Sequence, residues 1–112
     1  MYSFTAYDVM VAMLKHLPED RTSFHADYNA MIDFMTEELK KNFTRSEVEG
    51  GLSVIIGSGM LHWSSDMSDR KELNKQQINL VYSKFKKEEL LGEDGLKTAR
   101  DLSAKFAERF PQ

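Results

Sequence analysis

The stretch that decides the fold is residues 43–59, FTRSEVEGGLSVIIGSG, because it holds both a start and a stop signal for one helix. The start is a capping box: the Thr44 hydroxyl can accept from the backbone N–H of Glu47, whose carboxylate can reach back to the backbone N–H of Thr44. The stop is Gly59, since glycine readily adopts the left-handed conformation that ends many helices. We therefore predict a capped helix here and expect it to lie buried in the middle of the fold.

Two faces of this predicted helix differ in side-chain size. The broad apolar arc comprises Val48, Leu52, Ile55 and Ile56, and a separate narrow strip of small residues comprises Gly50, Ser53 and Gly57. Each glycine costs a helix about 1 kcal/mol relative to alanine, so close approach of another backbone would compensate for it. We therefore expect Gly50→Leu and Gly57→Leu each to destabilise the fold well beyond a typical surface substitution.

Apolar residues recur at three- and four-residue steps in four other segments, which predicts four further helices. They span residues 5–17, 24–39, 69–91 and 96–110. Ser23 can cap the second of these, and Gly92 to Gly95 form a turn before the last. The short apolar run at residues 78–83 also tolerates a strand, and we favour the helical interpretation.

Length and composition indicate one folded domain. The chain has 112 residues, which is enough for one hydrophobic core but not for two. Hydrophobic residues make up 41% and charged residues 29%, which is ordinary for a globular protein and too apolar for a disordered one. We predict an all-α fold: a single helical domain over residues 1–112, a bundle of about five helices with a helix-turn-helix-like segment in the middle.

Charge and cysteine content exclude several classes of function. The formal net charge is -3 and the pI is near 5.6, so the chain as a whole lacks the basic excess of a phosphate-binding protein. The absence of cysteine removes disulfides, thiolate metal sites and cysteine nucleophiles. The segment before Lys15 carries no positive charge, and Asp8 interrupts its apolar residues, which fits neither a signal peptide nor a membrane span. The expected location is the cytoplasm.

No local motif predicts catalysis, a metal site or a cofactor site. The three histidines, His16, His25 and His62, do not form a metal-binding frame. Ser58, within Gly57-Ser58-Gly59, lacks the flanking glycines of a nucleophile elbow, and no lysine follows as in a phosphate-binding loop. We therefore predict a protein that is not an enzyme and has no catalytic residues, metal or cofactor.

Residues 36–61 resemble a helix-turn-helix that ends at the entry to a wing, in hydrophobic spacing and in caps. The resemblance covers about a quarter of the chain and implies a DNA-binding transcriptional regulator. The basic residues that would then contact DNA are Arg45, Lys84, Lys86 and Lys87. Glu47, Glu49 and two glycines, however, stand where DNA readers usually present arginine, lysine, asparagine or glutamine.

The function that we predict first is therefore a small protein-interaction module, a regulator or inhibitor that acts by binding a protein partner or a second copy of itself. Aromatic residues concentrate in the cores of protein interfaces, so they are the candidate anchors. These candidates are Phe34, Trp63, Tyr82 and Phe85. The DNA-binding regulator is the alternative, and neither prediction involves a membrane. The sequence does not identify the partner.

Overall fold

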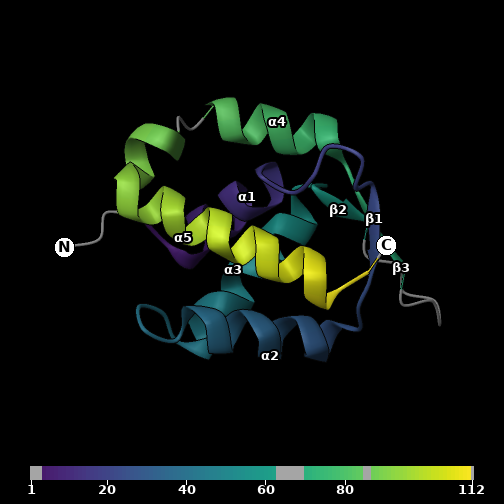
Figure 1. The fold of residues 1–112 in the computed structure, drawn as a ribbon, viewed down its shortest axis with the longest axis horizontal. Coiled ribbons are helices and arrows are strands. Elements are labelled where there is room, and N and C mark those ends of the chain that lie inside the picture. Colours follow the sequence, from purple (N-terminus) through teal and green to yellow (C-terminus); the bar gives the residue numbers. More distant parts are fainter. Residues whose placement is uncertain (1–3, 63–69, 85–86, 112) are drawn as a thin grey trace.

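The computed structural model describes residues 4–62, 70–84 and 87–111, and for residues 87–90 the backbone only. Within this part of the chain there are five helices and three short strands (Figure 1). In chain order they are α1 (Ala6–Lys15), β1 (Ser23–His25), α2 (Tyr28–Leu39), α3 (Arg45–Gly57), β2 (Leu61–His62), β3 (Arg70–Leu73), α4 (Lys75–Lys84) and α5 (Lys87–Arg109). The fold is mostly helical, but the all-α prediction is wrong because a small sheet is present.

The three strands form one antiparallel sheet in the order β1-β3-β2. Phe24 of β1 lies opposite Lys71 of β3, and Leu61 of β2 lies opposite Leu73 of β3. The strands contain three, two and four residues, which is too few for an alternating pattern to stand out from a helical one. The sheet therefore depends on pairing between distant segments, and the local sequence did not reveal it.

The predicted helix over residues 24–39 begins later than expected. Ser23 and Phe24 belong to β1, and α2 starts only after an N-cap at Asp27. The Asp27 carboxylate accepts a hydrogen bond from the backbone N–H of Ala30 at 2.7 Å. The predicted cap at Ser23 is wrong. In the sequence Phe24 fits the apolar stripe of the helix, which placed the helix start before it, but in the structure the backbone of Phe24 pairs in the sheet.

The predicted helix over residues 69–91 is divided into a strand and helical segments. Its first part is β3, and α4 follows after Asn74, whose side-chain oxygen accepts from the backbone N–H of Gln77 at 3.1 Å. The helical interpretation of residues 78–83 is confirmed. Gly92, in the predicted turn, has φ 67° and interrupts α5 with a kink, a conformation that favours glycine.

The central helix is α1 rather than α3, which corrects the expectation from sequence. Every residue of α1 except Tyr7 and Lys15 is buried, including the consecutive run from Val9 to Leu14. The helix packs against α5, α3 and α4, and Figure 1 shows it enclosed among them. A helix buried on all sides needs apolar residues all round, and this run of six supplies them.

Close packing between α1 and α3 occurs at Gly51. A Cβ atom built on Gly51 would lie 3.1 Å from Tyr7 Cα and 2.5 Å from Met10 Cε. Nothing lies within 4 Å of a Cβ built on Gly50 or Gly57, and both are exposed. The small-residue strip predicted to pack against another backbone therefore faces outward, because α3 meets α1 through the side of the helix that carries Gly51.

The capping box of α3 is confirmed. The Thr44 hydroxyl accepts from the backbone N–H of Glu47 at 3.2 Å, and Glu47 Oε1 accepts from the backbone N–H of Thr44 at 2.9 Å. We expect Thr44→Ala to lower the free energy of unfolding by about 1 kcal/mol, because an N-terminal N–H loses its acceptor. Urea denaturation followed by circular dichroism measures the change. Thr44→Ser, which keeps a hydroxyl, is the control and should stay close to the parent; equal losses would remove the cap as the cause.

Four phenylalanines join β1, α2 and α5 at one end of the core. The ring of Phe106 lies 5.0 Å from Phe24, 5.9 Å from Phe34 and 4.9 Å from Phe110, measured between centroids. Arg21 donates to the carbonyl oxygens of Ala107 at 3.0 Å and Phe110 at 2.5 Å, which satisfies acceptors at the end of α5. The apolar stripe predicted for the last helix is confirmed by the burial of Ala99, Leu102, Phe106 and Phe110.

Candidate interaction surface

Four of the exposed residues of α3 are small and uncharged and lie along one strip of the helix. We call this the α3 outer face; it comprises Ser46, Gly50, Ser53 and Gly57, all of which are exposed. The opposite side holds Val48, Gly51, Leu52 and Ile55, which are buried. Since successive residues turn by about 100° around a helix, packing of the second set against α1 directs the first set to the surface.

The charges around the α3 outer face are acidic or paired. Arg45 donates to Asp33 on α2 at 2.7 Å and to Glu49 at 3.1 Å. The hydrogen bond to Asp33, together with the charges of both carboxylates, raises the pKa of Arg45 above its usual value. Residues 28–57, which cover α2 and α3, contain five acidic and three basic residues. This part of the surface therefore does not provide a cluster of free cations.

A second feature lies where the end of α3 meets the start of α4. Gln77 Nε2 donates to the carbonyl oxygen of Ser58 at 3.0 Å. Val54 on α3 is 52% exposed and Leu80 on α4 is 60% exposed. A shallow hollow of about 350 Å³ lies beside this contact and is lined by Asn74, Gln76, Gln77 and Leu80. Two exposed aliphatic side chains and a hollow thus occur near one interhelical hydrogen bond.

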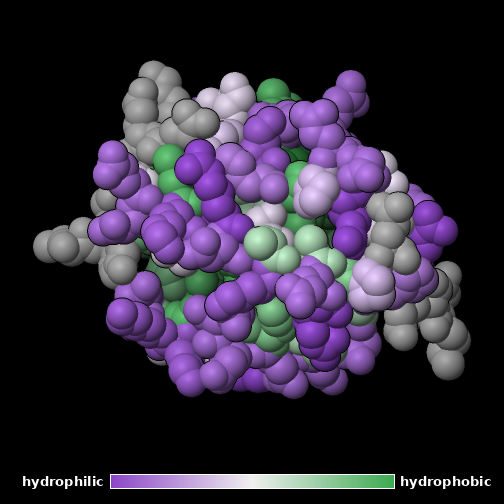
Figure 2. Space-filling view, viewed as in Figure 1, coloured by the Kyte–Doolittle hydropathy of each residue, from purple (hydrophilic) through white to green (hydrophobic). Residues whose placement is uncertain are grey.

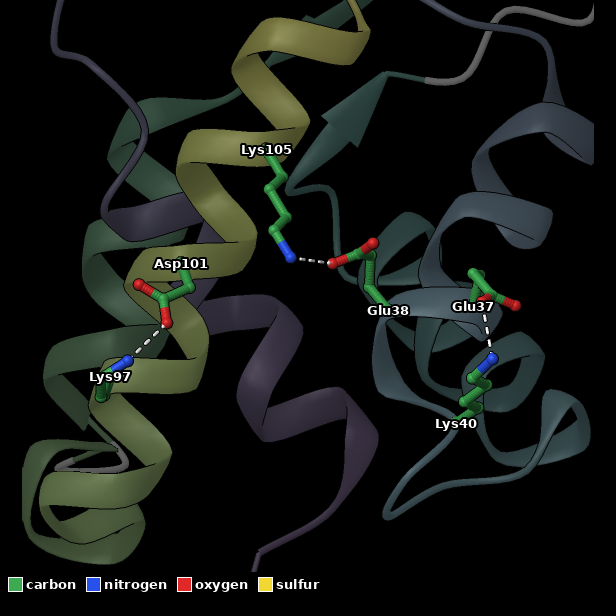
Figure 3. Close-up of polar contacts among 6 residues, drawn as sticks. All are labelled: Glu37, Glu38, Lys40, Lys97, Asp101 and Lys105. Carbon is green, nitrogen blue, oxygen red and sulfur yellow. Dashed lines mark hydrogen bonds and ion pairs between the residues drawn. The ribbon is translucent and has the colours of Figure 1, made fainter.

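A third feature is the groove between α2 and α5. Figure 3 shows Lys105 of α5 reaching across it to Glu38 of α2, with a nitrogen to oxygen distance of 2.8 Å. The same view shows Lys97 paired with Asp101 at 2.9 Å and Lys40 paired with Glu37 at 2.7 Å. The groove holds a hollow of about 160 Å³, lined by Glu38, Leu39, Thr98, Asp101, Leu102 and Lys105.

The groove between α2 and α5 has the chemistry of a structural contact. The hydrogen bond to Glu38 raises the pKa of Lys105, which keeps this amine protonated and therefore unable to act as a nucleophile or base near neutral pH. On the face seen in Figure 2, hydrophilic residues dominate the surface and hydrophobic ones form small patches among them. The Glu38–Lys105 pair is thus a surface ion pair that joins α2 to α5.

Of the four aromatic anchors predicted from the sequence, two are wholly or partly buried and two lie outside the described residues. Phe34 is half-buried, 5.4 Å from the ring of Phe110. Tyr82 is buried on the inner side of α4, edge-on to His16 at 6.0 Å. Trp63 and Phe85 lie outside the described residues. Phe34 and Tyr82 thus contribute to packing between elements, and the part of the four residues in partner binding stays a prediction.

The basic residues predicted for DNA contact are spread over different elements. Arg45 begins α3 and is held by two carboxylates, whereas Lys84 ends α4 and is exposed. Lys87 begins α5, but its side chain lies outside the description, as does the whole of Lys86. The structure does not bring Arg45 together with Lys84 on one helix.

Val54 and Leu80 are exposed residues that were not predicted from the sequence. A signal for Val54 was present, because a helical wheel places Val54 outside the apolar arc formed by Val48, Leu52 and Ile55. Leu80 similarly lies off the side of α4 that carries the buried residues Ile78 and Val81. Both are single apolar residues on polar helix surfaces, which is common enough that sequence alone does not mark them.

The described residues provide neither a cluster of metal ligands nor a helix that could span a membrane. No group of three or more histidine, aspartate or glutamate side chains in this part of the chain is arranged to hold a metal ion. None of its helices combines the length and apolar character needed to cross a bilayer. No protein-family model matches the chain, and neither the curated proteins nor the solved structures with which it was compared give a match.

Proposed function

We propose that this chain is a non-enzymatic module that binds a protein partner through the α3 outer face. The electrostatic character of α3 carries the proposal: the four residues of the α3 outer face are small and uncharged, and Arg45 beside them is engaged by Asp33 and Glu49. A nucleic-acid surface gains most of its affinity from lysine and arginine at phosphates. A protein partner does not require them, and its side chains can approach the α3 backbone closely at Gly50 and Gly57.

A DNA-binding regulator is the second candidate, because one observation favours it. The helices α2 and α3 are followed by the antiparallel pair β2 and β3, and the strand order β1-β3-β2 joins that pair to β1. This order resembles a winged helix-turn-helix, with α3 as the recognition helix. Fold alone does not assign function, since function depends on the site. The acidic residues of α2 and α3 support protein binding over DNA binding.

Replacing Ser53 with arginine separates the two candidate functions, because the substitution should weaken binding to a protein partner but strengthen binding to DNA. The substitution adds a long cation at the centre of the α3 outer face, and arginine is a good helix former, so the fold should persist. We expect Ser53→Arg to lower recovery of a specific protein on affinity capture from the native cell, quantified by mass spectrometry. Ala104→Arg, at an exposed position of α5, is the matched control and should recover as much as the parent.

Duplex DNA binding is measured with the same variants. We expect no binding of the parent to a random duplex at physiological salt. Any weak binding at low salt should disappear when Lys84, Lys86 and Lys87 are replaced, and should remain when Arg45 is replaced. If instead duplex binding is steeply salt-dependent, needs Arg45 and becomes tighter in Ser53→Arg, the DNA-binding regulator is correct.

A further inference from the structure

We propose that two copies of this chain associate through the junction of α3 and α4, with α3 of each copy packed against α4 of the other. We call this region the junction surface. It comprises Glu47 and Val54 on α3, Ser58 at the C-cap of α3, and Gln77, Leu80 and Lys84 on α4. The junction surface borders the α3 outer face, because Val54 lies one turn from Gly50 and from Gly57, but the proposal does not depend on the function proposed above.

One hydrogen bond sets the centre of the junction surface. The Gln77 side chain donates to the Ser58 carbonyl oxygen at 3.0 Å, where α3 ends and α4 has just begun. Val54 lies one turn before Ser58, and Leu80 lies about one turn after Gln77, so each shares a side of its helix with the contact. The two aliphatic residues therefore flank the hydrogen bond, and each has more than half of its surface exposed.

The charges at the two far ends of the junction surface are opposite. Glu47 lies two turns before Val54 on α3, and Lys84 lies one turn beyond Leu80 at the end of α4. Both side chains are exposed. Glu47 uses Oε1 to cap α3 and still presents a carboxylate to solvent. Going outward from the hydrogen bond at the centre, α3 thus presents an apolar residue and then an acidic one. In the same direction, α4 presents an apolar residue and then a basic one.

This arrangement is complementary to itself, which identifies a second copy as the occupant. A two-fold axis that bisects α3 and α4 exchanges the two helices, as an isologous dimer requires. Val54 of each copy then meets Leu80 of the other beside the hollow lined by Asn74 and Gln76, and Glu47 meets Lys84. Both helices rest on α1, so the surface is already formed in a single copy and binding orders little new structure.

A mixing experiment with two variants tests the two-fold pairing. We expect the whole chain to show a concentration-dependent monomer–dimer equilibrium by sedimentation velocity. Val54→Lys and Leu80→Glu each place a charge against an aliphatic residue twice per dimer, so each alone should raise the dimer dissociation constant on the order of tenfold or more. An equimolar mixture should recover dimer, because the heterodimer keeps one Val54–Leu80 contact and pairs the new lysine with the new glutamate. Both sites are exposed, and circular dichroism checks that each variant is folded.

Other outcomes overturn the proposal. A parent chain that remains monomeric at the highest attainable concentration excludes this dimer, and a dimer that persists in both variants places the contact elsewhere. If both variants dimerise more weakly than the parent and their equimolar mixture does not recover dimer, the two-fold pairing is excluded. Ser53→Arg, on the α3 outer face, should dimerise as the parent does. If the parent is monomeric and Val54→Lys captures less of a specific protein than the parent does, the junction surface binds a different protein instead of a second copy.

Discussion

Phe106→Ala should lower the free energy of unfolding by about 3–5 kcal/mol, the largest effect that we expect from a single truncation in this chain. The Phe106 ring is fully buried and lies within 6 Å of three other rings, those of Phe24, Phe34 and Phe110, counting between centroids. These rings come from β1, from α2 and from the residue that follows α5. Truncation removes the ring that all three share and leaves a cavity that helices anchored elsewhere cannot fill.

The consequence for folding follows from the usual size of protein stability. A domain is typically stable by only about 5–15 kcal/mol, so a loss of this size brings the chain close to its unfolding transition at room temperature. Urea denaturation followed by circular dichroism measures the loss where the variant still folds, and the fraction folded without denaturant measures it otherwise. Phe106→Leu, which keeps most of the buried volume, should cost clearly less. A loss below about 1 kcal/mol for Phe106→Ala would contradict the packing described for the four rings.

Gly51→Leu should destabilise the fold by about 3 kcal/mol, whereas Gly50→Leu should be neutral or slightly stabilising. A Cβ on Gly51 would lie 3.0 Å from the Tyr7 backbone nitrogen and 3.1 Å from Tyr7 Cα. The third neighbour, Met10 Cε at 2.5 Å, is the end of a flexible side chain and can move, but the Tyr7 backbone moves only if α1 shifts. Because α1 is central, that shift would disturb its contacts with α5 and α4 as well.

Gly50 provides a matched control for Gly51 because the two glycines are adjacent in one helix. Nothing lies within 4 Å of a Cβ at Gly50, so a leucine there meets solvent and regains up to about 1 kcal/mol of helix propensity. The pair of variants is compared by chemical denaturation midpoints. Similar losses at both positions would mean that α3 is not oriented on α1 as described, and a loss at Gly50 alone would place the small-residue strip in the core.

Several elements of this fold followed from the sequence because each depends on residues that are neighbours along the chain. The capping box at Thr44 and Glu47 involves a separation of three residues, and the stop at Gly59 depends on the conformation of that residue, which has φ 84°. The stripe of the last helix and the helical state of residues 78–83 likewise follow from spacings within one or two turns. Such signals are present in the local chain before any tertiary contact forms.

The candidate surface on α3 was not predicted from the sequence, which placed the small residues of this helix against another backbone and the partner-binding anchors on other segments. The acidic and small residues of α3 were evident from sequence, and they led to the preference for protein binding over DNA binding. Phe34 and Tyr82 were selected as anchors because aromatic residues concentrate in the cores of protein interfaces. Residues from other elements cover both, whereas Val54 and Leu80 have no such cover. Burial is set by neighbours that are distant in sequence, so a single helix cannot predict it.

Only the tertiary structure decided which helix is central, which glycine is packed and where the sheet lies. Gly50 and Gly51 are the same residue type on the same helix, and they differ only because α1 approaches one side of α3. Ser23 pairs with Glu72 although the intervening chain includes two helices, and a strand of three residues has no stable pairing of its own. These features arise from contacts between segments far apart in the chain, whose geometry exists only when the whole core has assembled.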